Sequence, residues 1–191
     1  MIHLALKFLK DQVLSRLHQD GEPDNVLLIS VVNDKGEYNI LPGQVSVSAI
    51  NIEEEKILKM QLPPERRTSD NVQFANPEIK LNVFMMLAAN PGKDFYEDAL
   101  RKLSEAIFLF QGVNVFDRIN FPLLDRGIEK LIVDLYTLSF EQQNQLWGSL
   151  GAKYIPSVIY KVRLIVIDDQ LYGANTPLIK TVDNHLHKIE N

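Results

Sequence analysis

Residues 78–112, with the sequence EIKLNVFMMLAANPGKDFYEDALRKLSEAIFLFQG, contain the two patterns that decide the fold class of this chain. Between Glu78 and Leu87, apolar side chains occupy every second position, which is the period of a β-strand with one buried face. The side chains on that face are Ile79, Leu81, Val83, Met85 and Leu87. We therefore expect a core strand over this range.

The second half of the stretch has the period of a helix. Its apolar residues recur at intervals of three and four, which indicates one buried stripe. The stripe consists of Tyr96, Ala99, Leu100, Leu103, Ala106, Ile107 and Phe110. Asp94 and Glu97 resemble a capping box at the start, and Gly112 stands where a glycine often ends a helix. We expect a helix from Asp94 to Gly112.

Toward the C-terminus, a strand pattern covers Glu129–Leu138. Ser139 and Gln142 then form a capping box, which predicts a short helix that ends near Gly151. A long strand follows over Ser157–Ile167, because apolar and polar residues alternate there.

Toward the N-terminus, an amphipathic helix pattern is carried by Ile2, Leu6, Leu9, Val13 and Leu17. The continuous apolar run Asn25–Val32 indicates a strand that is covered on both faces. Another strand covers Gln44–Ile52, and its alternation slips at Ala49–Ile50, which predicts a β-bulge.

The order of these elements favours an α+β (mixed α/β) fold, in which helices pack on a mixed β-sheet. Residues Leu62–Pro77 contain three prolines and show no periodicity, so we expect a long loop there. We expect one domain over residues 1–169 and an extended C-terminal tail over residues 170–191.

Composition excludes several function classes. The chain is 46% hydrophobic and 24% charged, with a net charge of -5, and its basic residues form no stripe of the kind that binds nucleic acid. It contains no cysteine, so disulfides, thiol nucleophiles and thiolate metal sites are excluded. Lys7, Lys10 and Asp11 interrupt the first apolar run too early for a signal peptide, and no run has the length of a membrane span.

Few residues are candidates for chemistry. His185 and His187, with Asp183, have the spacing of a partial metal site, although a polar pair in a tail is the alternative. The runs Glu53–Glu55 and Asp168–Asp169 supply carboxylates, but neighbours on a strand point to opposite faces. No glycine-rich phosphate loop or nucleophile motif occurs.

Two further features could contact a partner. Trp147 belongs either to the core or to an aromatic contact surface. The pair Arg66–Arg67 is either a solvated loop tip or part of a docking loop for an acidic partner.

Several segments, in order along the chain, resemble one protein family. They are residues 2–9 (IHLALKFL), 50–55 (INIEEE), 77–82 (PEIKLN), 96–104 (YEDALRKLS) and 146–163 (LWGSLGAKYIPSVIYKVR), of which the last is the most distinctive. The family contains the cap proteins, or tail terminators, of extracellular contractile injection systems. In this chain Ala49–Ile50 replaces the family's more usual pair, and the tail after Asp169 lies outside the resemblance.

The resemblance implies a tail-terminator-like fold and a ring of six copies that closes the inner tube and sheath at their distal end. The implied partners are further copies of the chain, the tube protein and the sheath protein, without nucleic acid or membrane. It implies no catalytic, cofactor or metal site. It also implies assembly in the cytoplasm, as part of a particle that the cell can release.

We expect the contacts in the segments that lack periodicity, Leu62–Asn76 and Gln170–Asn191. The candidate partner-contact residues are Arg66, Arg67, Phe74, Leu171, Tyr172, Leu178 and Ile179. Three alternatives stay open. They are an adaptor at the baseplate or between tube and sheath, a small enzyme built on scattered carboxylates with His3 or His18, and a monomeric peptide-binding module.

Overall fold

The structure is a computed structural model that describes residues 1–17, 25–55, 65–67, 71–74, 79–166 and 176–177. The chain divides into two compact units. The first comprises Met1–Lys59 and Ile79–Ile167, and the second comprises Met60–Glu78 and Asp168–Asn191. Each unit is described by itself.

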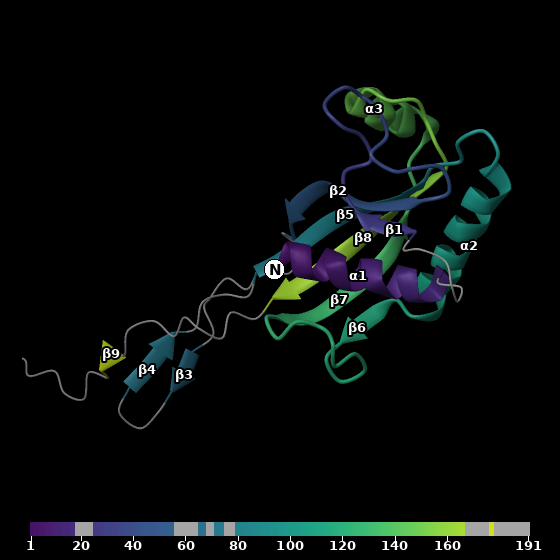
Figure 1. Ribbon diagram of the computed structural model, residues 1–191. Helices are drawn as coiled ribbons and strands as arrows, with labels where there is room; N and C mark the ends of the chain where they lie inside the picture. The colour runs from purple at the N-terminus through teal and green to yellow at the C-terminus, as the bar shows by residue number, and fades with distance from the viewer. Residues whose placement is uncertain (18–24, 56–64, 68–70, 75–78, 167–175, 178–191) are drawn as a thin grey trace, which may run out of the picture. The chain divides into compact units, whose positions relative to one another are not determined.

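The first unit is built on a six-stranded sheet with the order β1-β2-β5-β8-β7-β6 (Figure 1). The strands are β1 (Val26–Leu28), β2 (Val45–Glu54), β5 (Ile79–Ala89), β6 (Val115–Asp117), β7 (Ile128–Tyr136) and β8 (Ser157–Val166). β1 runs parallel to β2, and the other neighbours pair antiparallel. The sheet is therefore mixed, and the predicted α+β class is confirmed.

Two helices, α1 (Ile2–Leu17) and α2 (Tyr96–Gly112), cover one face of this sheet and form the main core with it. Alternate residues of the central strands point into that core, as the period-2 pattern predicts. The strand residues in the core include Val83, Met85, Leu87, Tyr160, Val162 and Leu164. The expected helix at the N-terminus is confirmed.

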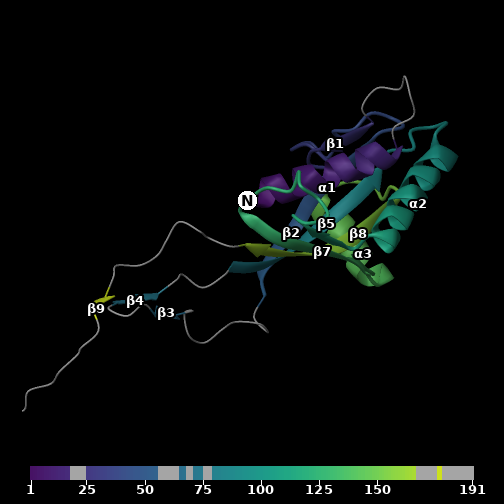
Figure 2. The same cartoon turned by 90° about the horizontal axis from the view of Figure 1, so that it is seen from below.

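The third helix, α3 (Phe140–Leu150), covers only one end of the opposite face (Figure 2). A smaller core lies there, in which Met86 and Ile159 pack with Trp147 of the helix. The turn at Gly36 supports the end of α3, because its backbone lies so close to Gly151 that a Cβ atom would clash with the carbonyl oxygen. The remainder of this sheet face has no helix from the described residues over it.

The expected bulge in β2 is present. Ala49 pairs with Met85 and Asn51 pairs with the next residue of β5, Phe84, so the register shifts at Ile50. An extra residue on one strand reverses the alternation beyond it. Val45 and Val47 point into the main core before the bulge, and beyond it Ile52 pairs with Val83 on the same face, where it is 48% exposed.

The predicted start of α2 is wrong in detail, whereas its predicted end at Gly112 is confirmed. Phe95 is the N-cap and no side chain caps the helix, so the expected capping box at Asp94 does not form. The chain turns at Pro91, whose carbonyl oxygen accepts a hydrogen bond from the Phe95 N–H, and this turn starts the helix. Gly112 is the last helical residue, and the cap Val113 is extended. The buried stripe is also narrower than predicted, because Tyr96 and Leu100 are exposed.

Two other boundaries differ from the sequence prediction. β1 ends at Leu28 rather than Val32, because the chain leaves the sheet there and takes Val31 and Val32 into the smaller core. The short edge strand β6 was not predicted, since three residues are too few for a period to show.

The second unit contains a three-stranded sheet of β3 (Glu65–Arg67), β4 (Asn71–Phe74) and β9 (Thr176–Pro177), in the order β3-β4-β9. The prediction of a loop without strands over Leu62–Pro77 is therefore wrong. β3 and β4 form a short antiparallel pair around residues 68–70, and strands of three and four residues carry too little pattern to be recognised. The expected boundary between residues 169 and 170 lies outside the described residues.

Candidate assembly surfaces

The residues considered for catalysis or metal binding are dispersed or outside the described part of the chain. His3 is exposed on α1. Glu53 accepts a hydrogen bond from Asn51, and Glu55 accepts one from Asn82. His18, Asp168, Asp169, Asp183, His185 and His187 lie outside the described residues. Within those residues, no three His, Cys, Asp or Glu side chains form a group that could hold a metal ion.

A buried lysine, missed by the sequence analysis, ties α2 to the loop before β2. The Lys102 Nζ donates a hydrogen bond of 2.6 Å to the carbonyl oxygen of Gly43 and lies 2.7 Å from the Asp98 carboxylate. Desolvation opposes the charge on Asp98, but hydrogen bonds and charges from Lys102 and Arg101 outweigh it, so its pKa is lowered. These contacts of Lys102 hold α2 against the loop before β2.

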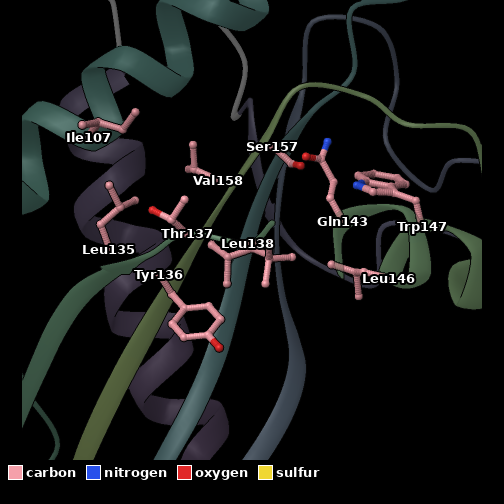
Figure 3. Close-up of a pocket in the computed structure, with 11 residues that line it drawn as sticks. Ile107, Leu135, Tyr136, Thr137, Leu138, Gln143, Leu146, Trp147, Ser157 and Val158 are labelled. Atoms are coloured by element: carbon pink, nitrogen blue, oxygen red, sulfur yellow. The ribbon is translucent and has the colours of Figure 1, made fainter. Parts of the chain in front are cut away.

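A groove lies between α3 and the sheet, where the strands β7 and β8 meet the helix (Figure 3). It consists of two adjacent hollows of about 230 and 320 Å³. The two hollows share four mostly apolar residues, Tyr136, Leu138, Leu146 and Ile159. Glu53 and Phe84 line the second hollow. We call this feature the α3 groove, and its apolar walls fit an apolar protein segment better than a polar substrate.

The sequence positions α3 accurately. The Ser139 hydroxyl accepts a hydrogen bond of 3.2 Å from the Gln142 N–H, and the Gln142 side chain accepts one of 3.0 Å from the Ser139 N–H. Gly151 ends the helix in the left-handed conformation, so both predicted signals are confirmed. Trp147 is buried and its ring packs edge to face on Tyr154, which confirms the core interpretation.

A second surface lies in the loop between β6 and β7, residues 118–127, which we call the knob loop. Ile119 is 91% exposed and Leu123 is 90% exposed, although both are large aliphatic residues. Their neighbours hold the loop in place. The Phe121 ring packs against Phe8 and Phe116, and Leu124 is buried in the main core. The knob loop is therefore an ordered support that presents two aliphatic side chains to solvent.

Sequence reasoning missed the knob loop because residues 118–127 show no periodicity. The turn-forming residues Asn120, Pro122 and Gly127 indicate a loop, but a sequence does not reveal which of its apolar residues point outward. In the structure Asn120 and Gly127 donate backbone hydrogen bonds to the Asp117 and Asp125 carboxylates. The one signal in the sequence that could have indicated this surface is the close spacing of apolar residues between turn-forming residues.

The predicted contact residues fall in the second unit. Arg66 pairs with Gln73, and Phe74 pairs with Glu65, in the β3–β4 ladder. The β4–β9 ladder joins Val72 to Thr176, so the structure brings part of both predicted contact segments into one sheet. Leu171, Tyr172, Leu178 and Ile179 lie outside the described residues. The role of these segments as interfaces stays a prediction.

Comparisons with known proteins agree with this fold. The family model for the Pvc16 N-terminal domain matches residues 5–181. The sheath/tube terminator of PVC, an extracellular contractile injection system, solved in the extended state, has a TM-score of 0.62 and 14% identity, and the match covers 100% of this chain and 64% of that one. The tube terminating cap of the anti-feeding prophage has a TM-score of 0.53 and 12% identity, with coverages of 95% and 60%.

A comparison with curated protein sequences gives no match. At these low identities the solved structures show the fold, and they confirm the expected tail-terminator-like architecture. This chain spans less than two thirds of the length of either solved chain. No helix among the residues described here is long and apolar enough to cross a membrane.

Proposed function

The chain belongs to the Pvc16 N-terminal domain family of contractile injection system tail terminators, and from this premise we propose that it caps the particle's inner tube and sheath. The cap would lie at the distal end and stop further growth. The observation that carries this proposal is the family match over residues 5–181, together with a fold shared with a sheath/tube terminator.

We propose that the cap is a ring of six copies. A closed ring needs two different surfaces on each subunit, because each copy meets one neighbour on either side. The first unit offers more than one exposed apolar surface for such contacts, namely the α3 groove and the knob loop. Apolar residues presented in this way commonly mark interaction sites.

The tube and sheath proteins are the proposed partners of the ring. The segments Leu62–Asn76 and Gln170–Asn191 are candidates for these contacts, with Arg66 and Arg67 on β3. An extended segment can bind by adding a strand to an exposed sheet edge, and the short second-unit sheet has such edges.

The proposed role is structural, without catalysis or cofactor. It is supported by the apolar character of the α3 groove and by the names of the solved neighbours, a terminator and a cap. We further propose assembly in the cytoplasm on a growing particle, which the cell then releases.

Locating the chain on the particle tests this function. An epitope-tagged chain is produced in cells that assemble the particles, and gold-labelled antibody is imaged by electron microscopy. We expect one label cluster per particle, at the end opposite the baseplate. Label at the baseplate or along the sheath would contradict the cap and favour an adaptor. An untagged strain controls for non-specific binding.

A further inference from the structure

The knob loop and the α3 groove lie at opposite ends of one strand. β7 begins at Ile128, directly after the knob loop, and ends at Tyr136, which lines the groove. Nine strand residues span about 26 Å, at about 3.3 Å per step. The two surfaces therefore cannot meet within one copy, and Figure 1 shows β6 and α3 at opposite ends of the sheet.

The two surfaces are complementary in shape and polarity. The knob loop offers Ile119 and Leu123 as protruding aliphatic side chains, and the groove offers two apolar hollows. A hollow that receives an aliphatic side chain removes apolar area of both partners from water, which drives association.

The charges beside the two surfaces are also complementary. Arg118 and Arg126 flank the exposed side chains of the knob loop, and neither forms an ion pair with any described residue. The nearby Asp117 and Asp125 carboxylates instead accept backbone hydrogen bonds from the loop. Glu53 lines the groove, and the exposed Glu141 lies on the first turn of α3. Opposite charges around an apolar contact favour one partner and fix its orientation.

We propose that the knob loop of one copy binds in the α3 groove of the next copy, and that this is the contact which repeats around the ring. The inference rests on the proposed ring and specifies its subunit interface. Because the two halves differ, the contact is heterologous, and repetition with the correct rotation closes a ring. The ordered loop reduces the entropy lost on binding, since Phe121 and Leu124 already hold it.

Engineered thiols provide a direct test, because the chain has no cysteine of its own. The test variant carries Leu123→Cys in the knob loop and Thr137→Cys at the groove. Both positions are exposed, so the fold should tolerate the changes. The matched control combines Leu123→Cys with Ser104→Cys, an exposed position on α2. A short bismaleimide cross-linker is applied to purified chain and to purified particles.

On a denaturing gel, we expect the test variant to give a ladder of multimers that ends at the closed ring. The two single variants, mixed, should give cross-linked dimers and nothing larger, since each copy then carries one thiol. The control pair should stay monomeric. A ladder from the control, or dimers from Leu123→Cys alone, would overturn the knob-to-groove contact. Cross-links from the groove to another particle protein would also overturn it.

The labelling and cross-linking experiments together show whether the proposed function or the proposed contact is wrong. If labelling places the chain at the distal end but the test variant stays monomeric in particles, the cap stands and the contact is wrong. If purified chain gives the ladder while the label lies elsewhere on the particle, the contact stands and the cap is wrong. A monomeric test variant in both samples overturns the contact.

Discussion

The rings of Phe8 and Phe121 lie edge to face, with their centroids 5.9 Å apart. This contact joins α1 to the loop between β6 and β7, because Phe8 belongs to the helix and Phe121 to the knob loop. It explains how a loop can expose Ile119 and Leu123 and still be ordered. Packing between these two rings holds the loop in place, and with it the exposed side chains.

Removing the Phe121 ring should therefore destabilise the protein and release the knob loop. Because Phe121 is only partly buried, we expect Phe121→Ala to lower the free energy of unfolding by about 2 kcal/mol, below the loss for a fully buried ring. Urea denaturation measures this value. Ile119→Ala is the control and should change stability by less than about 0.5 kcal/mol. Equal stability of the two variants would contradict the anchoring role.

The buried Lys102 should contribute more to stability than its exposed neighbour Arg101. Lys102→Met keeps most of the volume but removes the hydrogen bond to the Gly43 carbonyl, so we expect a loss of about 2 kcal/mol. Arg101→Met removes only a partly exposed ion pair with Asp98 and should cost less than about 1 kcal/mol. Thermal unfolding of both variants measures the difference, and the reverse order would contradict this interpretation.

Tyr160 should make stability depend on pH in the alkaline range. Burial raises its pKa to about 12 from 10.0, because the charged phenolate is disfavoured in the core. The contribution of the neutral group is complete below pH 10.0 and is lost as the pH rises toward about 12. The hydroxyl has no hydrogen-bond partner among the described residues, so Tyr160→Phe should fold well.

The measurement is urea denaturation of wild type and Tyr160→Phe at several pH values. We expect the wild type to lose stability relative to the variant as the pH rises above 10.0. A stability difference that stays constant across this range would show that Tyr160 does not titrate differently in the folded state.

Charge reversal at the paired arginines on β3 tests whether the predicted docking segment contacts the particle. Replacing Arg66 and Arg67 by Glu reverses two charges and should reduce the amount of the chain on purified particles. Quantitative immunoblotting against the tube protein measures it. Lys7→Glu with Lys10→Glu, on α1, serves as a charge-matched control. Unchanged occupancy in the arginine variant would remove this segment from the proposed interface.

The sequence predicts the framework well where patterns are long. Strands of nine to eleven residues such as β5, β7 and β8 repeat the period-2 pattern several times, and α3 carries both a capping box and a terminal glycine. The slip at Ala49–Ile50 even locates the bulge. The elements that the sequence missed altogether are short ones, namely β3, β4 and β6, in which three or four residues cannot define a period.

The surfaces could not be predicted in the same way. Exposure of Leu123 and burial of Lys102 both contradict the usual preference of their side chains, and each depends on contacts distant in sequence. Lys102 is buried because Gly43 and Asp98 provide partners for its charge. Leu123 is exposed because Phe121 and Leu124 fill the available core positions.

The most direct test of the central claim, that the chain terminates the tube and sheath, is to delete its gene and measure tube lengths by electron microscopy. We expect tubes without caps and of widely varying length, or sheaths that fail to stay assembled, and we expect the gene supplied in trans to restore uniform particles. Capped particles of uniform length from the deletion strain would contradict the claim.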